Sequence, residues 1–447
     1  MNKYPKKPSG PTDSSVLANP SHQTQAIHGA FKTGAWNFSH HLVPPMTTST
    51  TFRLESLKRG AQGFQNFGQN KMKEPILIYD RLDEPNTLML EEQLCALHQG
   101  EVAIAFGSGM GAISTLMMSL VQQGQKIVAH QTLYGCTYSL LKNWLPRFGI
   151  KTEFKDLNHF AELAPTHKSD SIPSLKKYLE DPETRLIYFE TLSNPQLEFI
   201  NFKPLLEIVK DENKKRRDDN KILVAVDNTF ATPWGCRPLE LGFDFVIESL
   251  TKNISGFGTD MGGTIITSKQ YEVPLRVGRK DFGAIMTAHS AWHIMVYGVA
   301  TQSLRFQKQQ ENAMVIAGFL EAHPKIEKVL YPGLASYPYY SLTKEYLKSP
   351  EGQYSPGTMM AFRLNGDFAQ TEKFVDDIAE NSYAITLAVS LGLTKTLIEV
   401  PGYMTHSAMS AEDQCKSGID PKLIRLSVGL ENADDIIRDL NTALDRI

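Results

Sequence analysis

The sequence has few cysteines, almost no excess charge and no long apolar run. The four cysteines among 447 residues, Cys95, Cys136, Cys236 and Cys415, lie far apart, which indicates neither a disulfide framework nor a zinc site. The 46 basic and 49 acidic residues nearly cancel, which excludes a broad basic surface for nucleic acid or an anionic membrane. No run approaches the roughly 18 apolar residues of a spanning helix, and the first residues lack the apolar core of a signal peptide. These features predict a soluble, cytoplasmic protein without a metal site.

The sequence does contain enough apolar residues for more than one core. At 447 residues and 41% hydrophobic composition, the chain is expected to form two domains with an additional arm. Residues 1–83 are expected to form an N-terminal tail and arm. Its first part, residues 1–25, is polar and without apolar periodicity, which predicts a mobile tail.

Two short apolar runs, Leu223–Val226 and Phe243–Ile247, each end in polar residues. Their length predicts buried strands rather than helices. Polar side chains follow each run: Asp227 after the first, and Ser249, Thr251 and Lys252 after the second. Because the carboxyl ends of parallel strands meet at one edge of a sheet, these side chains are expected at the edge where open α/β sheets bind ligands.

An aspartate and a lysine at one sheet edge suit pyridoxal phosphate. A carboxylate such as Asp227 keeps the pyridine nitrogen protonated, and an amine such as Lys252 bonds covalently to the aldehyde. Ser249 and Thr251 are placed to hydrogen-bond the phosphate. For the aspartate and lysine taken alone, an ordinary ion pair at a sheet edge is the alternative.

The surrounding stretch, ESLTKNISGFGTDMGG, resembles the lysine motif of the cysteine and methionine metabolism (trans-sulfuration) family of pyridoxal phosphate enzymes. Matching segments run in the family's order from about Tyr79 to Glu431. The resemblance implies an α/β protein of fold type I, like aspartate aminotransferase. Its large cofactor domain, residues 84–302, would contain a mainly parallel seven-stranded sheet, and residues 303–447 would form a smaller α+β domain.

Two further segments match the parts of the family that hold the cofactor phosphate. Residues 102–120 predict a strand, a glycine turn and a helix, whose backbone N–H groups and dipole form an anion site; the resemblance places Gly109 and Met110 on the phosphate. The segment IYDRLDEP resembles the motif that brings Tyr79 and Arg81 to the cofactor phosphate of a neighbouring subunit, where an arginine makes charge-assisted contacts.

The resemblance also implies residues around the ring and the substrate. Tyr134 matches a tyrosine that stacks on the pyridine ring and acts as an acid or base, and Asn194 matches the asparagine that binds the phenolic oxygen. Ser390 and Arg425 match the residues that hold the substrate α-carboxylate. A buried core tyrosine and a structural ion pair are the alternatives for Tyr134 and Arg425.

Four residues resemble the methionine γ-lyase branch of the family. Cys136 stands where methionine γ-lyases have cysteine and other members commonly have glycine. The segment GRKDFGAIMTAHSA resembles the one that places a lysine and an aspartate, Lys280 and Asp281, beside that cysteine. Val389 stands where enzymes that recognise the distal amino group of cystathionine tend to have glutamate.

The function implied is γ-elimination from methionine to methanethiol, 2-oxobutyrate and ammonia. Within the family the alternatives are γ-replacement on an O-acylhomoserine and cystathionine γ-lyase activity. The family resemblance further implies a homotetramer of tight dimers with active sites shared across each dimer. A non-catalytic member is a remote alternative, favoured by Asn253 and Phe257, which replace the usual tyrosine and histidine; Glu84 and Leu192 also depart from the family pattern.

Overall fold

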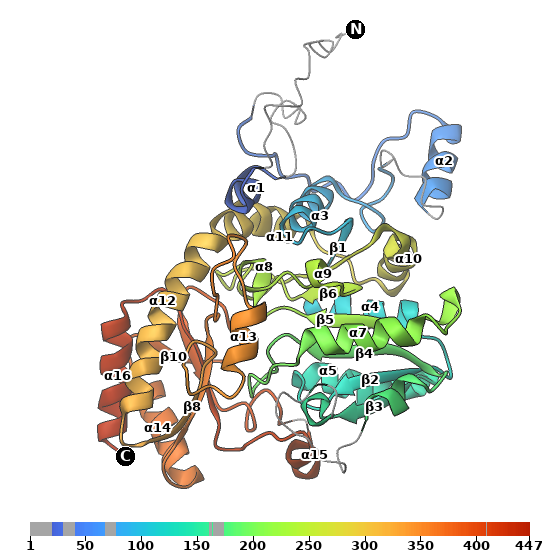
Figure 1. Cartoon of the computed structure of the whole chain (residues 1–447). Helices are drawn as coiled ribbons and strands as arrows, with labels where there is room; N and C mark the ends of the chain where they lie inside the picture. The colour runs from blue at the N-terminus through green and yellow to red at the C-terminus, as the bar shows by residue number, and fades with distance from the viewer. Residues whose placement is uncertain (1–19, 30–40, 68–76, 161–162, 164–173, 408) are drawn as a thin grey trace.

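Two β-sheets form the centres of the computed structural model, which describes residues 20–29, 41–67, 77–160, 163, 174–407 and 409–447 (Figure 1). The larger sheet has seven strands in the order β1-β7-β6-β5-β4-β2-β3. They are β1 Val102–Phe106, β2 Lys126–His130, β3 Lys151–Lys155, β4 Thr184–Glu190, β5 Leu223–Asp227, β6 Phe245–Glu248 and β7 Gly263–Thr267. Only β7 runs antiparallel to its neighbours. This confirms the prediction of a mainly parallel seven-stranded sheet.

The central strands are apolar along their whole length because both faces of the sheet are covered. Successive residues of β5 face different cores: Leu223 and Ala225 belong to one apolar cluster, and Val224 and Val226 to another. This alternation is the period of two expected of a strand. Helix α4 packs on the first side, and helices α3 and α7 pack on the second. Parallel sheets are normally buried in this way.

The helices around the large sheet are mostly short. They are α3 Pro85–Leu97, α4 Gly109–Leu120, α5 Gly135–Ser139, α6 Lys176–Leu179, α7 Phe202–Asn213, α8 Thr232–Gly235, α9 Pro238–Leu241, α10 Glu272–Phe282 and α11 Ala288–His293. The π and 3-10 segments are η2 Leu140–Trp144, η3 Leu145–Phe148, η4 Leu157–His159, η5 Asp218–Asn220, η6 Lys269–Tyr271 and η7 Ile294–Val299. In the described part of the chain, no helix combines the length and apolarity needed to cross a membrane.

The C-terminal part is built on a five-stranded sheet in the order β10-β11-β12-β9-β8. Its strands are β8 Ile326–Leu330, β9 Met359–Leu364, β10 Ile385–Leu387, β11 Thr396–Glu399 and β12 Ile424–Ser427, with helices α12 Ala300–Ala322, α13 Tyr340–Tyr346, α14 Phe368–Asn381, α15 Ala411–Lys416 and α16 Ala433–Asp445. Phe362 of β9 packs in a core with α14 and α16, whereas Met359 and Ala361 face the core shared with the large sheet. The two sheets are therefore joined through a common core.

A nearly continuous helical run joins the two parts. Helix α11, segment η7 and helix α12 follow one another over residues 288–322, close to the connecting helix that residues 290–323 suggest by their apolar spacing. Figure 1 shows α12 passing from the large sheet to the smaller one. The predicted boundary between residues 302 and 303 falls inside α12, so a division at that point stays a prediction.

The N-terminal part contains two helices that the sequence patterns did not predict. Residues 1–19 of the expected tail lie outside the described residues, but α1, His22–His28, overlaps its end. Ala26 of α1 is buried, and its carbonyl oxygen accepts a hydrogen bond from Gln93 Nε2 at 2.7 Å. Helix α2, Leu57–Phe67, projects away from the rest of the chain (Figure 1).

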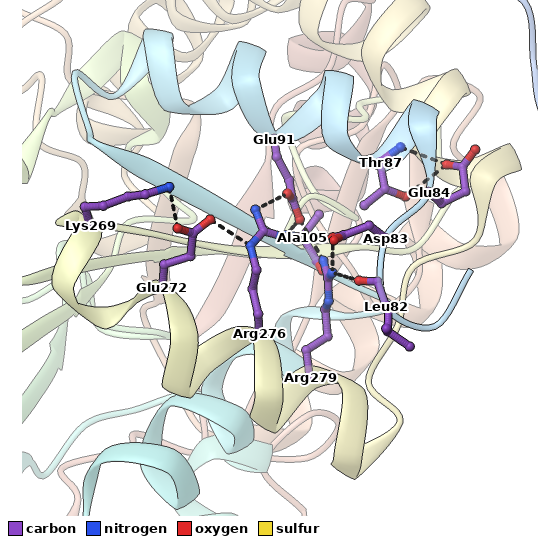
Figure 2. Close-up of polar contacts among 10 residues, drawn as sticks. All are labelled: Leu82, Asp83, Glu84, Thr87, Glu91, Ala105, Lys269, Glu272, Arg276 and Arg279. Carbon is purple, nitrogen blue, oxygen red and sulfur yellow. Dashed lines mark hydrogen bonds and ion pairs between the residues drawn. The ribbon is translucent and has the colours of Figure 1, made fainter. Parts of the chain in front are cut away.

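A buried network of ion pairs joins α3 to α10 across the edge of the large sheet (Figure 2). Glu91 of α3 accepts from Arg276 at 2.9 Å and from Arg279 at 2.7 Å. Both arginines also lie 3.2 Å from Asp83, and Arg279 donates to the carbonyl oxygen of Leu82 at 2.6 Å. Removing one member of a buried pair typically costs about 3 to 5 kcal/mol. The network therefore fixes the segment just after Tyr79 and Arg81 against α10.

Candidate active site

A cavity of about 400 Å³ opens at the carboxyl ends of the central strands, between the two sheets. Twelve of the predicted site residues line it: Gly109, Met110, Tyr134, Cys136, Asn194, Asp227, Ser249, Thr251, Lys252, Val389, Ser390 and Arg425. They come from strand ends of the large sheet, from the start of α4, and from the C-terminal part. The topology thus brings together residues that are more than 300 positions apart in the sequence.

Lys252 lies just beyond β6 and points toward the C-terminal part. Its Nζ donates to Ser390 Oγ at 2.9 Å. Burial, and next the positive charge of Arg425, lower the pKa of Lys252 from its ordinary 10.5 to about 8. A buried amine with this pKa is partly neutral near neutral pH, and the neutral form is the nucleophile and base.

This pKa predicts how covalent cofactor capture depends on pH. Because only the neutral amine attacks an aldehyde, the rate of capture by cofactor-free protein is expected to rise about tenfold per pH unit below pH 8 and to level off above it. Rapid mixing with pyridoxal phosphate, followed by visible absorbance, measures this rate. A rate that still rises steeply between about pH 9 and pH 10 would show an unperturbed lysine.

Two carboxylates lie side by side at the ends of β4 and β5. Glu190 and Asp227 are register partners in the parallel ladder. Burial raises the pKa of Asp227 to about 6, and burial together with the charge of Asp227 raises the pKa of Glu190 to about 8. Asp227 accepts from Thr229 N at 3.0 Å, and among the described residues it has no ion-pair partner. A protonated pyridine nitrogen would supply the missing positive charge, so this end of the cavity fits pyridoxal phosphate.

The start of α4 fits the phosphate of the same cofactor. Ser108 caps the helix through its side chain, and the first N–H groups of the helix, including those of Gly109 and Met110, have no partner within it. A Cβ added at Gly109 would lie 2.9 Å from Ser249 Cβ, so glycine is needed for the hydroxyl of Ser249 to approach. Helix N–H groups and a hydroxyl in one place form an anion site.

Arg425 is held in a fixed position on the opposite wall. Its Nη1 donates to Asn194 Oδ1 at 3.0 Å, and its Nη2 donates to the carbonyl oxygen of Ser390 at 3.0 Å. Nη2 also lies 2.9 Å from Glu399 Oε1. Ser390 has φ of 96°, a strained conformation for a residue other than glycine and one that is typical of functional sites. Arg425 thus makes a structural ion pair and also lines the cavity.

Tyr134 and Cys136 stand at the start of α5, beside Lys252 in the cavity. Burial, and next the neighbouring thiol of Cys136, raise the pKa of the Tyr134 hydroxyl above its usual range. The hydroxyl therefore stays protonated at neutral pH and is a proton donor. Tyr134 lines the cavity rather than filling a core.

The remaining four predicted residues do not line this cavity. Arg81 Nη1 donates to the carbonyl oxygen of Lys280 at 3.1 Å, and its guanidinium lies 5.4 Å from the centre of the Tyr79 ring. Lys280 pairs with Asp281 at 2.7 Å. These contacts join four residues into one surface cluster: Tyr79, Arg81, Lys280 and Asp281.

Comparison with known proteins agrees with this geometry. The profile of the family described as Cys/Met metabolism PLP-dependent enzymes matches residues 23–445. The chain belongs to this family. It is therefore a pyridoxal phosphate-dependent enzyme, as the Asp227 and Lys252 arrangement predicts.

Three relatives illustrate the range within the Cys/Met metabolism family. The L-methionine gamma-lyase of Fusobacterium nucleatum subsp. nucleatum is 37% identical, over 95% of this chain and 98% of the relative. The O-acetyl-L-homoserine sulfhydrylase of Leptospira meyeri is 31% identical, over 98% and 100%. A solved O-acetylhomoserine (thiol)-lyase from Campylobacter jejuni, containing a pyridoxyl-lysine monophosphate, has a TM-score of 0.81 and 29% identity, over 95% and 100%. These similarities confirm fold type I.

The sequence analysis missed two charged residues at or next to the cavity. Glu190 accepts from the backbone N–H groups of Tyr134 at 2.7 Å and Asn194 at 2.8 Å, so it orients two predicted site residues. Its position at the end of the apolar run LIYFET was the available signal, because the neighbouring run also ends in a carboxylate. Glu399 was also missed, although it is the one charged residue in the short strand TLIE.

Proposed function

We propose that the enzyme cleaves L-methionine by γ-elimination, consuming one water and releasing methanethiol, 2-oxobutyrate and ammonia. The composition of the cavity wall carries this proposal. Among the described lining residues the only carboxylates are Glu190 and Asp227, both at the strand ends. The wall also contains Cys136, Val389, Met261 and other uncharged side chains. Such a wall suits a methylthio group and offers no charge for a second ammonium.

The residues of the cavity then have distinct tasks. Bound pyridoxal phosphate supplies an electron sink, with Asp227 at its ring nitrogen and Ser249, Thr251, Gly109 and Met110 at its phosphate. Lys252, as a neutral amine, moves protons at Cα and Cβ of the substrate. Tyr134 donates a proton to the departing sulfur. Arg425, Ser390 and Asn194 would hold the α-carboxylate, and Asn194 would also bind the phenolic oxygen of the cofactor.

The surface cluster is assigned to the cavity of a neighbouring subunit. Tyr79 and Arg81 would meet the partner's cofactor phosphate, and Lys280 and Asp281 would stand near its thiol at position 136. This is supported by the contact of Arg81 with Lys280 and by the fact that neither residue lines the cavity of its own chain. The catalytic unit is then a dimer, within a homotetramer in the cytoplasm.

Three residues that depart from the family pattern, two of them close to Lys252 in the sequence, have structural partners. This argues against a non-catalytic protein. Asn253 is buried and donates to Gln309 Oε1 at 3.0 Å. Phe257 packs under the guanidinium of Arg305 at 5.2 Å. Glu84 caps α3 by accepting from Thr87 N at 2.9 Å. These substitutions fit the fold locally, and Lys252, Tyr134 and Arg425 are all in place.

A second candidate is γ-replacement on an O-acylhomoserine, which the similarity to sulfhydrylases favours. Cystathionine γ-lyase activity is the other alternative. Values of kcat/KM for methionine, cystathionine, and O-acetylhomoserine with sulfide separate these activities. We expect methionine to be preferred over cystathionine by at least about tenfold, because the described cavity wall gives the distal ammonium of cystathionine no carboxylate partner beyond the strand ends. Equal use of cystathionine, or much faster use of O-acetylhomoserine, would contradict the proposal.

Val389→Glu tests the preference for methionine over cystathionine by changing the enzyme instead of the substrate. A carboxylate at this position would pair with the distal ammonium, so the substitution is expected to narrow or invert the preference for methionine. Val315, an exposed valine of α12, is a matched control, since the two side chains are 56% and 53% exposed. Val315→Glu should leave the ratio of the two kcat/KM values unchanged. An unchanged ratio in Val389→Glu would remove this residue from the specificity site.

A further inference from the structure

Glu399 is an acid in direct contact with the arginine assigned to the substrate carboxylate. It is the register partner of Arg425 in the antiparallel pair β11 and β12, and its Oε1 lies 2.9 Å from Arg425 Nη2. Glu399 is 1% exposed. Oε1 also accepts from Thr405 Oγ1 at 3.0 Å, whereas Oε2 has no hydrogen-bond partner among the described residues. One oxygen of this buried carboxylate is thus well satisfied and the other is not.

The donors of Arg425 are already heavily used. Nη2 has two N–H groups, and it contacts both the carbonyl oxygen of Ser390 and Glu399. Nη1 donates to Asn194. A substrate carboxylate at Arg425 would bring a second negative charge to the same guanidinium, within a site largely removed from water. Two carboxylates that share one cation in such surroundings do not both stay ionised.

We propose that Glu399 is a positioning residue that holds Arg425 until substrate arrives, and that it takes up one proton from solvent when the substrate α-carboxylate binds. The proton neutralises Glu399, so that Arg425 faces a single carboxylate. Substrate affinity is thereby coupled to pH through a residue that does not line the cavity. The inference rests on the proposed role of Arg425 in carboxylate binding.

The charges around Glu399 determine the direction of this coupling. Burial raises the pKa of Glu399, while Arg425 and next Thr405 oppose the rise; Lys252 also faces it. Two further titratable groups lie near Glu399. Tyr134 senses its charge, and His406 is linked to it through the hydroxyl of Thr405. A bound carboxylate raises the pKa of Glu399 further. The affinity for substrate should therefore fall as the pH rises above the pKa that Glu399 has in the free enzyme. It should level off above the pKa that Glu399 has in the complex. The total change in affinity is tenfold for each unit by which these two pKa values differ.

A ligand without an amine isolates this effect. The probe is 4-(methylthio)butanoate, which is methionine without its α-amino group and so cannot exchange with Lys252. Its neutral amide is the control, because it meets the same titrating groups without adding charge. Calorimetry of the holoenzyme in two buffers of different ionisation enthalpy measures the protons taken up. In a pH series we expect the acid to take up protons, with a maximum approaching one, and the amide to take up none.

Three variants assign the proton. In Glu399→Gln the uptake should disappear, and at pH values where the unmodified enzyme takes up a proton the acid should bind more tightly to the variant than to the unmodified enzyme. The control Glu327→Gln removes an acid of the same small sheet that pairs with Arg363 at 3.1 Å on the surface, and it should retain the uptake. Arg425→Lys should weaken binding of the acid at least about tenfold, because lysine lacks the planar fork.

The outcomes distinguish a failure of the inference about Glu399 from a failure of the proposed function. Binding that depends on Arg425 but takes up no proton, or uptake that persists in Glu399→Gln, overturns the inference and leaves the proposed function standing. Binding of the acid that is indifferent to Arg425→Lys overturns both. Since the proton count of the unmodified enzyme needs no variant, a failure of Glu399→Gln to fold would still leave the inference open to refutation.

Discussion

Lys252→Ala is expected to lower turnover of methionine by at least about a thousandfold, because the variant loses both the covalent attachment point and the base that moves substrate protons. The purified variant should also show no borohydride-reducible bond to pyridoxal phosphate. Activity with methionine, and mass spectrometry after borohydride treatment, measure the two effects.

A matched control is Lys328→Ala, which removes an exposed lysine of β8. It should retain full activity and the reducible bond. If Lys252→Ala kept both, another lysine would hold the cofactor and the central cavity would be misassigned.

A mixture of Arg81→Ala and Lys252→Ala proteins, assayed without added pyridoxal phosphate, is expected to be more active than either protein alone. Arg81→Ala should weaken cofactor retention about tenfold or more through loss of a charge-assisted contact. If the surface cluster serves the neighbouring subunit, each hybrid dimer contains one site with both lesions and one site with none. Random exchange would make about half of the dimers hybrids, so about a quarter of all sites would be intact.

The control for this experiment is a mixture of Lys252→Ala with Tyr134→Phe. Lys252 and Tyr134 line the same cavity of one chain, so each hybrid site keeps one lesion and no recovery is expected. Exchange must be verified with differently tagged subunits. Verified exchange without recovery in the Arg81→Ala mixture would count against a site shared between subunits.

The strand-end residues could be predicted because short apolar runs followed by polar side chains are a local pattern. Asp227 ends β5 and Lys252 follows shortly after β6, and the turn at Gly107 and Ser108 leads into α4 as expected. These features depend on neighbouring residues in the chain, which the sequence displays directly.

The missed residues depend on contacts between distant segments. Glu190 interacts with Asp227 because β4 and β5 are neighbours in register, and Glu399 faces Arg425 because β11 and β12 pair. Each is an ordinary charged residue until that pairing is known. Helix α2 was missed because its residues are polar and include two glycines, Gly60 and Gly63, which lower intrinsic helix propensity.

The placement of Lys280 and Asp281 shows the same difficulty at the level of assembly. The family resemblance puts them beside Cys136, yet in one chain they lie with Arg81 outside the cavity. A sequence pattern states which residues meet at a site but not which subunit contributes them. The mixing experiment addresses that question for the whole surface cluster.

The proposed activity of this cavity is γ-elimination from methionine. Its most direct test is to incubate purified holoenzyme with L-methionine and to quantify methanethiol, 2-oxobutyrate and ammonia together. We expect the three products in equal amounts, formed at a rate proportional to the enzyme concentration. No products should form with Lys252→Ala. Failure to form 2-oxobutyrate from methionine, with rapid formation of homocysteine from O-acetylhomoserine and sulfide, would contradict it.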